Sequence, residues 1–215
     1  MHSFSAPGPR PLSSTVIGAS SYRTVKLLLD ILQGMGVSAA AGLRPFLPTL
    51  LVGALAADDL GVDFDHTDFA FLESPWFLLA IVVALVVTTL LRSRFETPAG
   101  EAALGGIGLG LGALLFAGTL DDRHATWWPG ILGGLVCALI AQQGARSLLT
   151  RTRARLDAEA AGALFLYAEA AALLIAGLSV LIPPVSVLAV AFLIWLRLGG
   201  RRREGEKYAG LRILR

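Results

Sequence analysis

Residues 42–48 read GLRPFLP and lie inside an apolar run that extends from about residue 25 to about residue 57. A cationic side chain at the centre of a membrane-spanning helix costs about 3 kcal/mol even on insertion scales, which give the lowest values. Pro45 removes a backbone N–H and disfavours the helical conformation at Arg44, and Gly42 loosens the turn before it. An interrupted backbone is tolerated at membrane depth only where protein or water covers it. We therefore expect Gly42, Arg44 and Pro45 to form the centre of a functional site.

The composition indicates an integral membrane protein. Hydrophobic residues make up 55% of the 215-residue chain and charged residues 16%, and the mean hydropathy is +0.68. A soluble domain carries roughly a quarter charged residues. The formal net charge of +2 does not point to a nucleic-acid partner, because the basic residues lie between apolar runs. The single cysteine, Cys137, lies within an apolar run, which excludes a disulfide framework and a cysteine metal site.

Several apolar runs approach the roughly 20 residues that are needed to cross the hydrocarbon core of a bilayer. The first run, residues 25–57, would be about 50 Å long as one straight helix, against a core about 30 Å thick. We therefore expect it to break at Pro45. The remaining runs are residues 75–91, 100–120, 129–149, 162–182 and 185–198. The sequence predicts an all-α integral membrane protein with about six transmembrane helices.

The distribution of basic residues predicts the orientation. The loops after the second, fourth and sixth runs hold Arg92, Arg94, Arg151, Arg153, Arg155, Arg201, Arg202 and Arg203. The other loops hold only Arg123, and cytoplasmic loops are the ones that carry an excess of Lys and Arg. We expect a multi-pass protein of the plasma (inner) membrane, with both termini in the cytoplasm and the acidic loop at residues 58–74 outside. The transmembrane domain would occupy residues 23–199, between a disordered tail at residues 1–22 and a basic tail at residues 200–215.

The two halves of the chain, about 25–120 and 127–198, share a short motif. Residues 42–47, GLRPFL, align with residues 144–149, GARSLL. With three spans each, the halves would have opposite orientations, and inverted repeats are typical of secondary transporters whose sites lie at discontinuous helices. The motif fits a 3+3 duplication that brings Arg146 to the site. It also fits a chance match in which Arg146 extends to the cytoplasmic interface.

Glu169 is a second charge at membrane depth, about two turns inside the fifth run. A buried carboxylate is neutralised or finds a cation, and Arg44 and Arg146 are the available cations. Two interpretations follow: a structural ion pair that joins two helices, or a gate or proton-coupled site. The half-helix expected to begin at Pro45 would direct its amides and the positive end of its dipole at a ligand, which favours an anion.

The chain resembles a bacterial family of polytopic membrane proteins that is catalogued only as a domain of unknown function. The residues that carry the resemblance are 42–48, 50–55 and 74–77, and the resemblance extends over about residues 34–198. It implies a helical membrane protein with a GLRPFLP-type first span and a small-residue third span. It implies no particular activity.

The sequence gives no sign of a metal or cofactor. Residues 63–67 read DFDHT, like the start of a calcium-binding loop, but Asp68 stands where that loop needs glycine and Ser74 where it needs glutamate. We expect a solvated acidic loop there. No nucleophile elbow, P-loop or dinucleotide fingerprint occurs, so the sequence predicts neither catalytic residues nor an enzyme.

These features predict a membrane transporter or channel for a small anionic or polar solute. Its substrate-binding or gating residues would be Arg44, Glu169, Arg146, Gly42 and Pro45. Two alternatives stay open: a flippase or scramblase that binds a lipid phosphate, and a non-transporting scaffold or assembly factor whose buried charges are structural.

The third apolar run carries glycines at alternate positions, among them Gly106 and Gly110. Small residues four apart let two helices approach closely. This helix face would pack within the bundle or join two copies as a homodimer. The remaining expected partner is the lipid bilayer itself.

Overall fold

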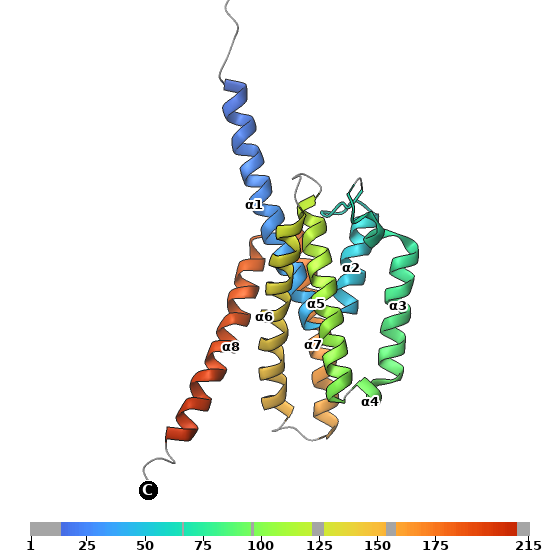
Figure 1. Cartoon of the computed structure of the whole chain (residues 1–215), viewed down its shortest axis with the longest axis vertical. Helices are drawn as coiled ribbons and strands as arrows, with labels where there is room; N and C mark the ends of the chain where they lie inside the picture. The colour runs from blue at the N-terminus through green and yellow to red at the C-terminus, as the bar shows by residue number, and fades with distance from the viewer. Residues whose placement is uncertain (1–13, 66, 96, 122–126, 154–157, 210–215) are drawn as a thin grey trace, which may run out of the picture.

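The computed structural model describes residues 14–65, 67–95, 97–121, 127–153 and 158–209, which form the all-α bundle of Figure 1. The predicted all-α class is confirmed. In chain order the elements are α1 (Ser14–Leu43), α2 (Phe46–Ala57), the short 3-10 helix η1 (Ala70–Glu73), α3 (Pro75–Leu90), α4 (Arg92–Phe95), α5 (Pro98–Asp121), α6 (Trp128–Arg153), α7 (Ala158–Leu181) and α8 (Val185–Ala209). Residues 14–22 and 200–209, which we expected in the tails, belong to α1 and α8.

Three segments are long and apolar enough to cross a membrane: Thr24–Leu43, Pro98–Leu120 and Trp128–Leu149. Four shorter apolar helices accompany them, at Phe46–Ala57, Pro75–Leu90, Leu166–Leu181 and Val185–Leu198. The helix lengths and composition are those of a membrane protein. By length alone they do not give the six spans of the sequence prediction.

The first apolar run forms a helical hairpin, and not the single broken crossing that we expected. The side chain of Gln33 on α1 donates a hydrogen bond of 2.7 Å to the carbonyl of Gly61, which follows α2. The chain has therefore returned along α1 after turning at Arg44 and Pro45, and α2 runs back toward the end of the bundle where α1 begins (Figure 1). Pro45 disfavours a helical conformation at Arg44, and the helix direction changes there. The apex of the hairpin lies inside the bundle.

The two described ends of the chain lie at different ends of the bundle. The first turns of α1 and the loop between α2 and α3 lie at one end of the bundle, whereas α4 and the last turns of α8 lie at the other (Figure 1). The contacts agree, because Gly36 of α1 packs on Ser186 at the start of α8 and Gly144 of α6 packs on Leu193 further along it. Both ends of the chain were expected on one side. The described residues that begin and end the chain, Ser14 and Ala209, lie at opposite ends.

The C-terminal half of α1 lies at the centre of the bundle (Figure 1) and is held there by small residues. A Cβ added at Gly42 would overlap the backbone of Ala138 on α6, and one added at Gly108 on α5 would lie 2.9 Å from the carbonyl oxygen of Ala41. The buried hydroxyl of Ser38 donates a hydrogen bond of 2.6 Å to the carbonyl of Gly134 on α6. Close helix approach through small residues is the packing mode that membrane helices use.

The glycines of α5 divide between two faces. Gly108 and Gly112 are buried against α1 and α6, in agreement with packing within the bundle. Gly106 and Gly110 are exposed, and a Cβ added at either would meet no atom within 4 Å. The face named for a homodimer is therefore open in the single chain.

In the described part of the second half, the aligned segment does not form a hairpin apex. Residues 144–149, the segment that aligns with residues 42–47, lie inside the uninterrupted helix α6. Ser147 stands where the first half has Pro45, and its hydroxyl donates to the carbonyl of Gly144 at 2.9 Å, a bond that helical backbone accommodates. The structure thus gives the expected 3+3 repeat no support at this segment.

Candidate functional site

The hairpin apex brings together the two charged residues that the sequence places inside apolar runs. Arg44 lies between α1 and α2, and its backbone N–H still bonds to the carbonyl of Ala40 at 3.0 Å. Its Nε lies 3.5 Å from Oε1 of Glu169 on α7, and the two side chains are 18% and 11% exposed. Of the two cations considered for Glu169, the structure selects Arg44.

A side-chain hydrogen bond at the start of α2 helps to shape the apex. Pro45 precedes α2 with helical backbone angles, φ −71° and ψ −39°. The hydroxyl of Thr49, which is buried, donates to the carbonyl of Pro45 at 2.6 Å and satisfies it inside the bundle. Pro48 and Thr49 are among the most buried side chains of the chain. The GLRPFLP segment therefore fixes the place from which Arg44 extends.

A pocket of about 160 Å³ lined by both polar and apolar residues lies at the apex, between α5 and α6. It is lined by Gly42, Leu43, Arg44, Pro45, Glu101, Leu104, Gly105, Gln142, Ala145, Arg146 and Leu149. The predicted site residues Gly42, Arg44 and Pro45 thus line the pocket. Arg146, which the aligned motif predicted at the site, lines it as well. Glu169 does not line the pocket, so Arg44 is the residue that joins the pocket to the carboxylate.

Arg146 lies at the mouth of the pocket. Its side chain is exposed, and its Nη2 donates a hydrogen bond of 3.1 Å to the backbone carbonyl of Glu101 on α5. A Cβ at Gly105 would overlap the amide of Gln142 and lie 2.9 Å from Nη2 of Arg146. Glycine at position 105 therefore gives these two α6 side chains room beside α5.

The sequence prediction missed Glu101, Gly105 and Gln142. Gln142 and Gln143 are adjacent polar residues inside an apolar run, and that was a usable signal. Glu101 stands at the edge of its run, where a charged residue is ordinary at a membrane interface. Only the pairing of α5 with α6 shows that these side chains share one pocket.

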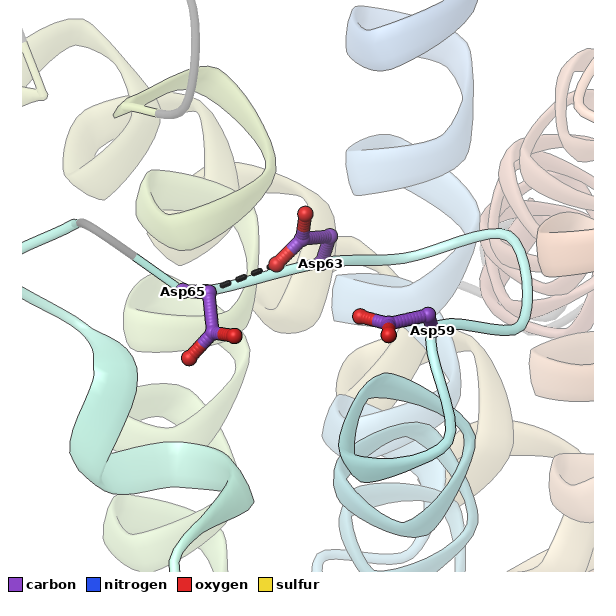
Figure 2. Close-up of side chains that lie close together, drawn as sticks. All are labelled: Asp59, Asp63 and Asp65. Atoms are coloured by element: carbon purple, nitrogen blue, oxygen red, sulfur yellow. Dashed lines mark hydrogen bonds between the residues drawn. The ribbon is translucent and has the colours of Figure 1, made fainter.

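A second polar group lies at the opposite end of the bundle, in the loop after α2. Figure 2 shows Asp59, Asp63 and Asp65, and one carboxylate oxygen from each of them lies within 4.8 Å of the other two. The backbone N–H of Asp65 donates to Oδ1 of Asp63 at 2.8 Å, and Asp59 has a positive φ of 54° that turns the chain after α2. Carboxylate oxygens are ligands that Ca²⁺ accepts, but these three are exposed, as solvated acidic loops commonly are.

Glu73 closes this loop from η1. The N–H of Phe64 donates to Oε2 of Glu73 at 3.4 Å. Partial burial, followed by the hydrogen bond and negative charge of Asp65 and the charge of Asp63, raises the pKa of Glu73 above its ordinary value of 4.5. Crowded carboxylates favour protonation of one of their number. His66, which the sequence placed in this loop, lies outside the described residues.

The comparisons place the chain in a family and go no further. The chain matches no curated protein and no solved structure. The model of the family described as a domain of unknown function, DUF4126, matches residues 31–202. That range includes the hairpin apex, the pocket and Glu169, and it confirms the family resemblance seen in the sequence. The chain therefore belongs to the DUF4126 family.

Proposed function

We propose that the protein is a membrane transporter or channel for a small anionic or polar solute, and that the pocket at the α1–α2 apex binds this solute. One observation carries the proposal. Arg44 and Arg146, from separate helical segments of an apolar bundle, line the same cavity of about 160 Å³. Ionisable residues inside membrane bundles face cavities and mark substrate pathways.

The charges of the pocket favour an anion. Arg44 and Arg146 outnumber the one carboxylate in the lining, Glu101, and Glu169 lies behind Arg44. α2 begins just after Pro45, so the positive end of its dipole adds to the same field. Pockets that bind drug-sized ligands measure about 300–1,000 Å³, so this smaller cavity favours an ion or a compact solute.

We place α3, α5, α6, α7 and α8 across the membrane, with the α1–α2 hairpin entering from the outer side. The arginine-rich loops and the end of α8 then lie in the cytoplasm, as the positive-inside rule requires. The acidic loop after α2 lies outside. In this arrangement the mouth of the pocket at Arg146 faces the cytoplasm, and the hairpin apex closes the path to the other side.

Flux through reconstituted vesicles tests the proposal. Wild type is expected to move at least one of chloride, nitrate, sulfate and methanesulfonate faster than protein-free vesicles do. Arg44→Lys keeps the charge but loses the planar guanidinium that binds oxyanions in two places, and Arg146→Gln loses the charge. We expect both variants to slow flux. Exposed Arg94 on α4, which does not line the pocket, provides the control Arg94→Gln.

A lipid-phosphate flippase or scramblase is the second candidate, and the exposure of Arg146 at the pocket mouth favours it. A lipid phosphate could reach this guanidinium without entering the cavity. The same vesicles therefore receive a labelled phospholipid and a labelled polyprenyl phosphate. Lipid movement without solute flux would replace the first function by the second. A well-folded protein that moves neither would be a scaffold.

A further inference from the structure

We propose that anion binding in the pocket is coupled to protonation of Glu169, because the anion and the Glu169 carboxylate compete for Arg44. This inference rests on the proposed function. Arg44 lines the pocket and also forms the ion pair with Glu169. A solute that engages the Arg44 guanidinium therefore acts on Glu169 without touching it.

The ion pair is weakly made. The Nε–Oε1 distance of 3.5 Å exceeds the about 2.8 Å of a charge-assisted hydrogen bond. The second carboxylate oxygen, Oε2 of Glu169, is buried and has no hydrogen-bond partner within the described residues. The ionised Glu169 carboxylate is therefore stabilised by the Coulomb attraction of Arg44, and its buried Oε2 can accept a proton. A purely structural ion pair would be expected to use both oxygens.

Among the described residues, Glu169 has few other charged side chains on the helices around it. α7 packs against α1, α2, α6 and α8. The segment α2 has no titratable side chain. On α1, Tyr22, Lys26 and Asp30 lie N-terminal to the apex. The described titratable groups of the other two helices are Cys137 and Arg146 on α6 and Arg197 on α8, and Tyr167 shares α7 with Glu169. Arg44 is the group whose charge acts on the Glu169 carboxylate.

The coupling follows from linkage. When an anion binds Arg44, its negative charge offsets part of the guanidinium charge that stabilises the ionised Glu169 carboxylate. The ionised form of Glu169 in its apolar surroundings is then less stable relative to the protonated form. Glu169 then takes up one proton from the buffered solvent, and the added anion and proton leave the net charge of the site unchanged. Coupling between two sites is reciprocal, so protonation of Glu169 must strengthen anion binding. The protein would carry an anion together with a proton.

The test measures anion binding and proton uptake by the purified full chain in nanodiscs. Nitrate and methanesulfonate are the probes, because neither titrates near neutral pH. Over the range in which Glu169 is ionised in the free protein, we expect the affinity to increase up to about tenfold for each unit by which the pH falls. A pH dye in weak buffer should record up to one proton taken up for each anion bound.

Glu169→Gln is the decisive variant, because it mimics the protonated side chain. It should bind both probes tightly at all pH values and take up no proton. Arg94→Gln should behave as wild type. Anion binding that is independent of pH in wild type, or proton uptake that persists in Glu169→Gln, overturns the coupling but leaves the proposed function standing. Absence of probe binding to wild type at every pH, with no flux, overturns both.

Discussion

At the scale of single residues, the molecule depends on how Arg44 and Glu169 share their charges. Each is mostly buried, with 18% and 11% of its side chain exposed. Removing one partner of a buried ion pair leaves an uncompensated charge, which costs about 3–5 kcal/mol, whereas replacing both by apolar groups is often neutral. The pair by itself is therefore weak evidence for stability.

A double-mutant cycle measures this interaction. Arg44→Leu and Glu169→Leu should each lower the free energy of unfolding by about 3 kcal/mol, and the double variant should recover much of the loss. Thermal unfolding in nanodiscs would give the values. Effects of the two single changes that simply add would show that the side chains do not interact.

Glu73 gives a prediction for the loop between α2 and α3. Its pKa is raised in the folded state by burial and by Asp65, so the loop gains stability below the ordinary value of 4.5. That gain is lost as the pH rises through the higher folded-state pKa. Glu73→Gln cannot ionise and should make the loop more stable than wild type at neutral pH, with little change in acid. Hydrogen exchange of residues 58–74, corrected for intrinsic rates, would show it; equal protection in both proteins at neutral pH would contradict it.

At the scale of the elements, the hairpin is held by close contact between helices. Gly42 touches the Ala138 backbone on α6, and Gly34 and Gly36 are similarly enclosed by side chains of other helices. The apex therefore sits where α5 and α6 leave room only for hydrogen atoms. A small change in side-chain volume should move the whole hairpin.

Gly42→Ala tests this packing, and Gly110→Ala on α5 is the matched control. A Cβ at position 42 would overlap the backbone of Ala138, which cannot shift without moving α6. The variant should therefore lose about 1–3 kcal/mol of stability and widen the pocket mouth. A Cβ at position 110 meets open space, and alanine favours a helix over glycine by about 1 kcal/mol. Unfolding measurements on both variants check the contrast, and equal stabilities would show that the α1–α6 contact is looser than the structure has it.

At the scale of the whole molecule, the sequence predicted the all-α class, the family resemblance and the interruption at Pro45. It did not predict the direction of α2, because hydropathy is the same for a hairpin and for a crossing. The contact that distinguishes them, from Gln33 to Gly61, joins residues on either side of the turn. The pocket was missed in part for a similar reason, since Glu101 and Gln142 meet only after α5 and α6 pair.

Cysteine labelling tests the orientation. In a Cys137→Ala background, cysteines at exposed Tyr22 and Asp65 should react with a membrane-impermeant thiol reagent in intact cells, and one at exposed Arg94 should not. Tyr22 is the informative position, because the hairpin puts it on the same side as Asp65. Labelling at position 65 with protection at position 22 would restore a crossing by the first apolar run. Labelling at position 94 alone would invert the bundle.

The central place of α1 also has a consequence for biosynthesis. The ribosome makes the hairpin first, yet the helices that it packs against, α5, α6 and α7, are translated later. Until α7 emerges, the apex arginine has no Glu169 to meet and little reason to enter lipid. The nascent hairpin must therefore wait at the membrane surface, or in the insertion machinery, while the later helices are threaded. The segment translated first is the last to reach its final position.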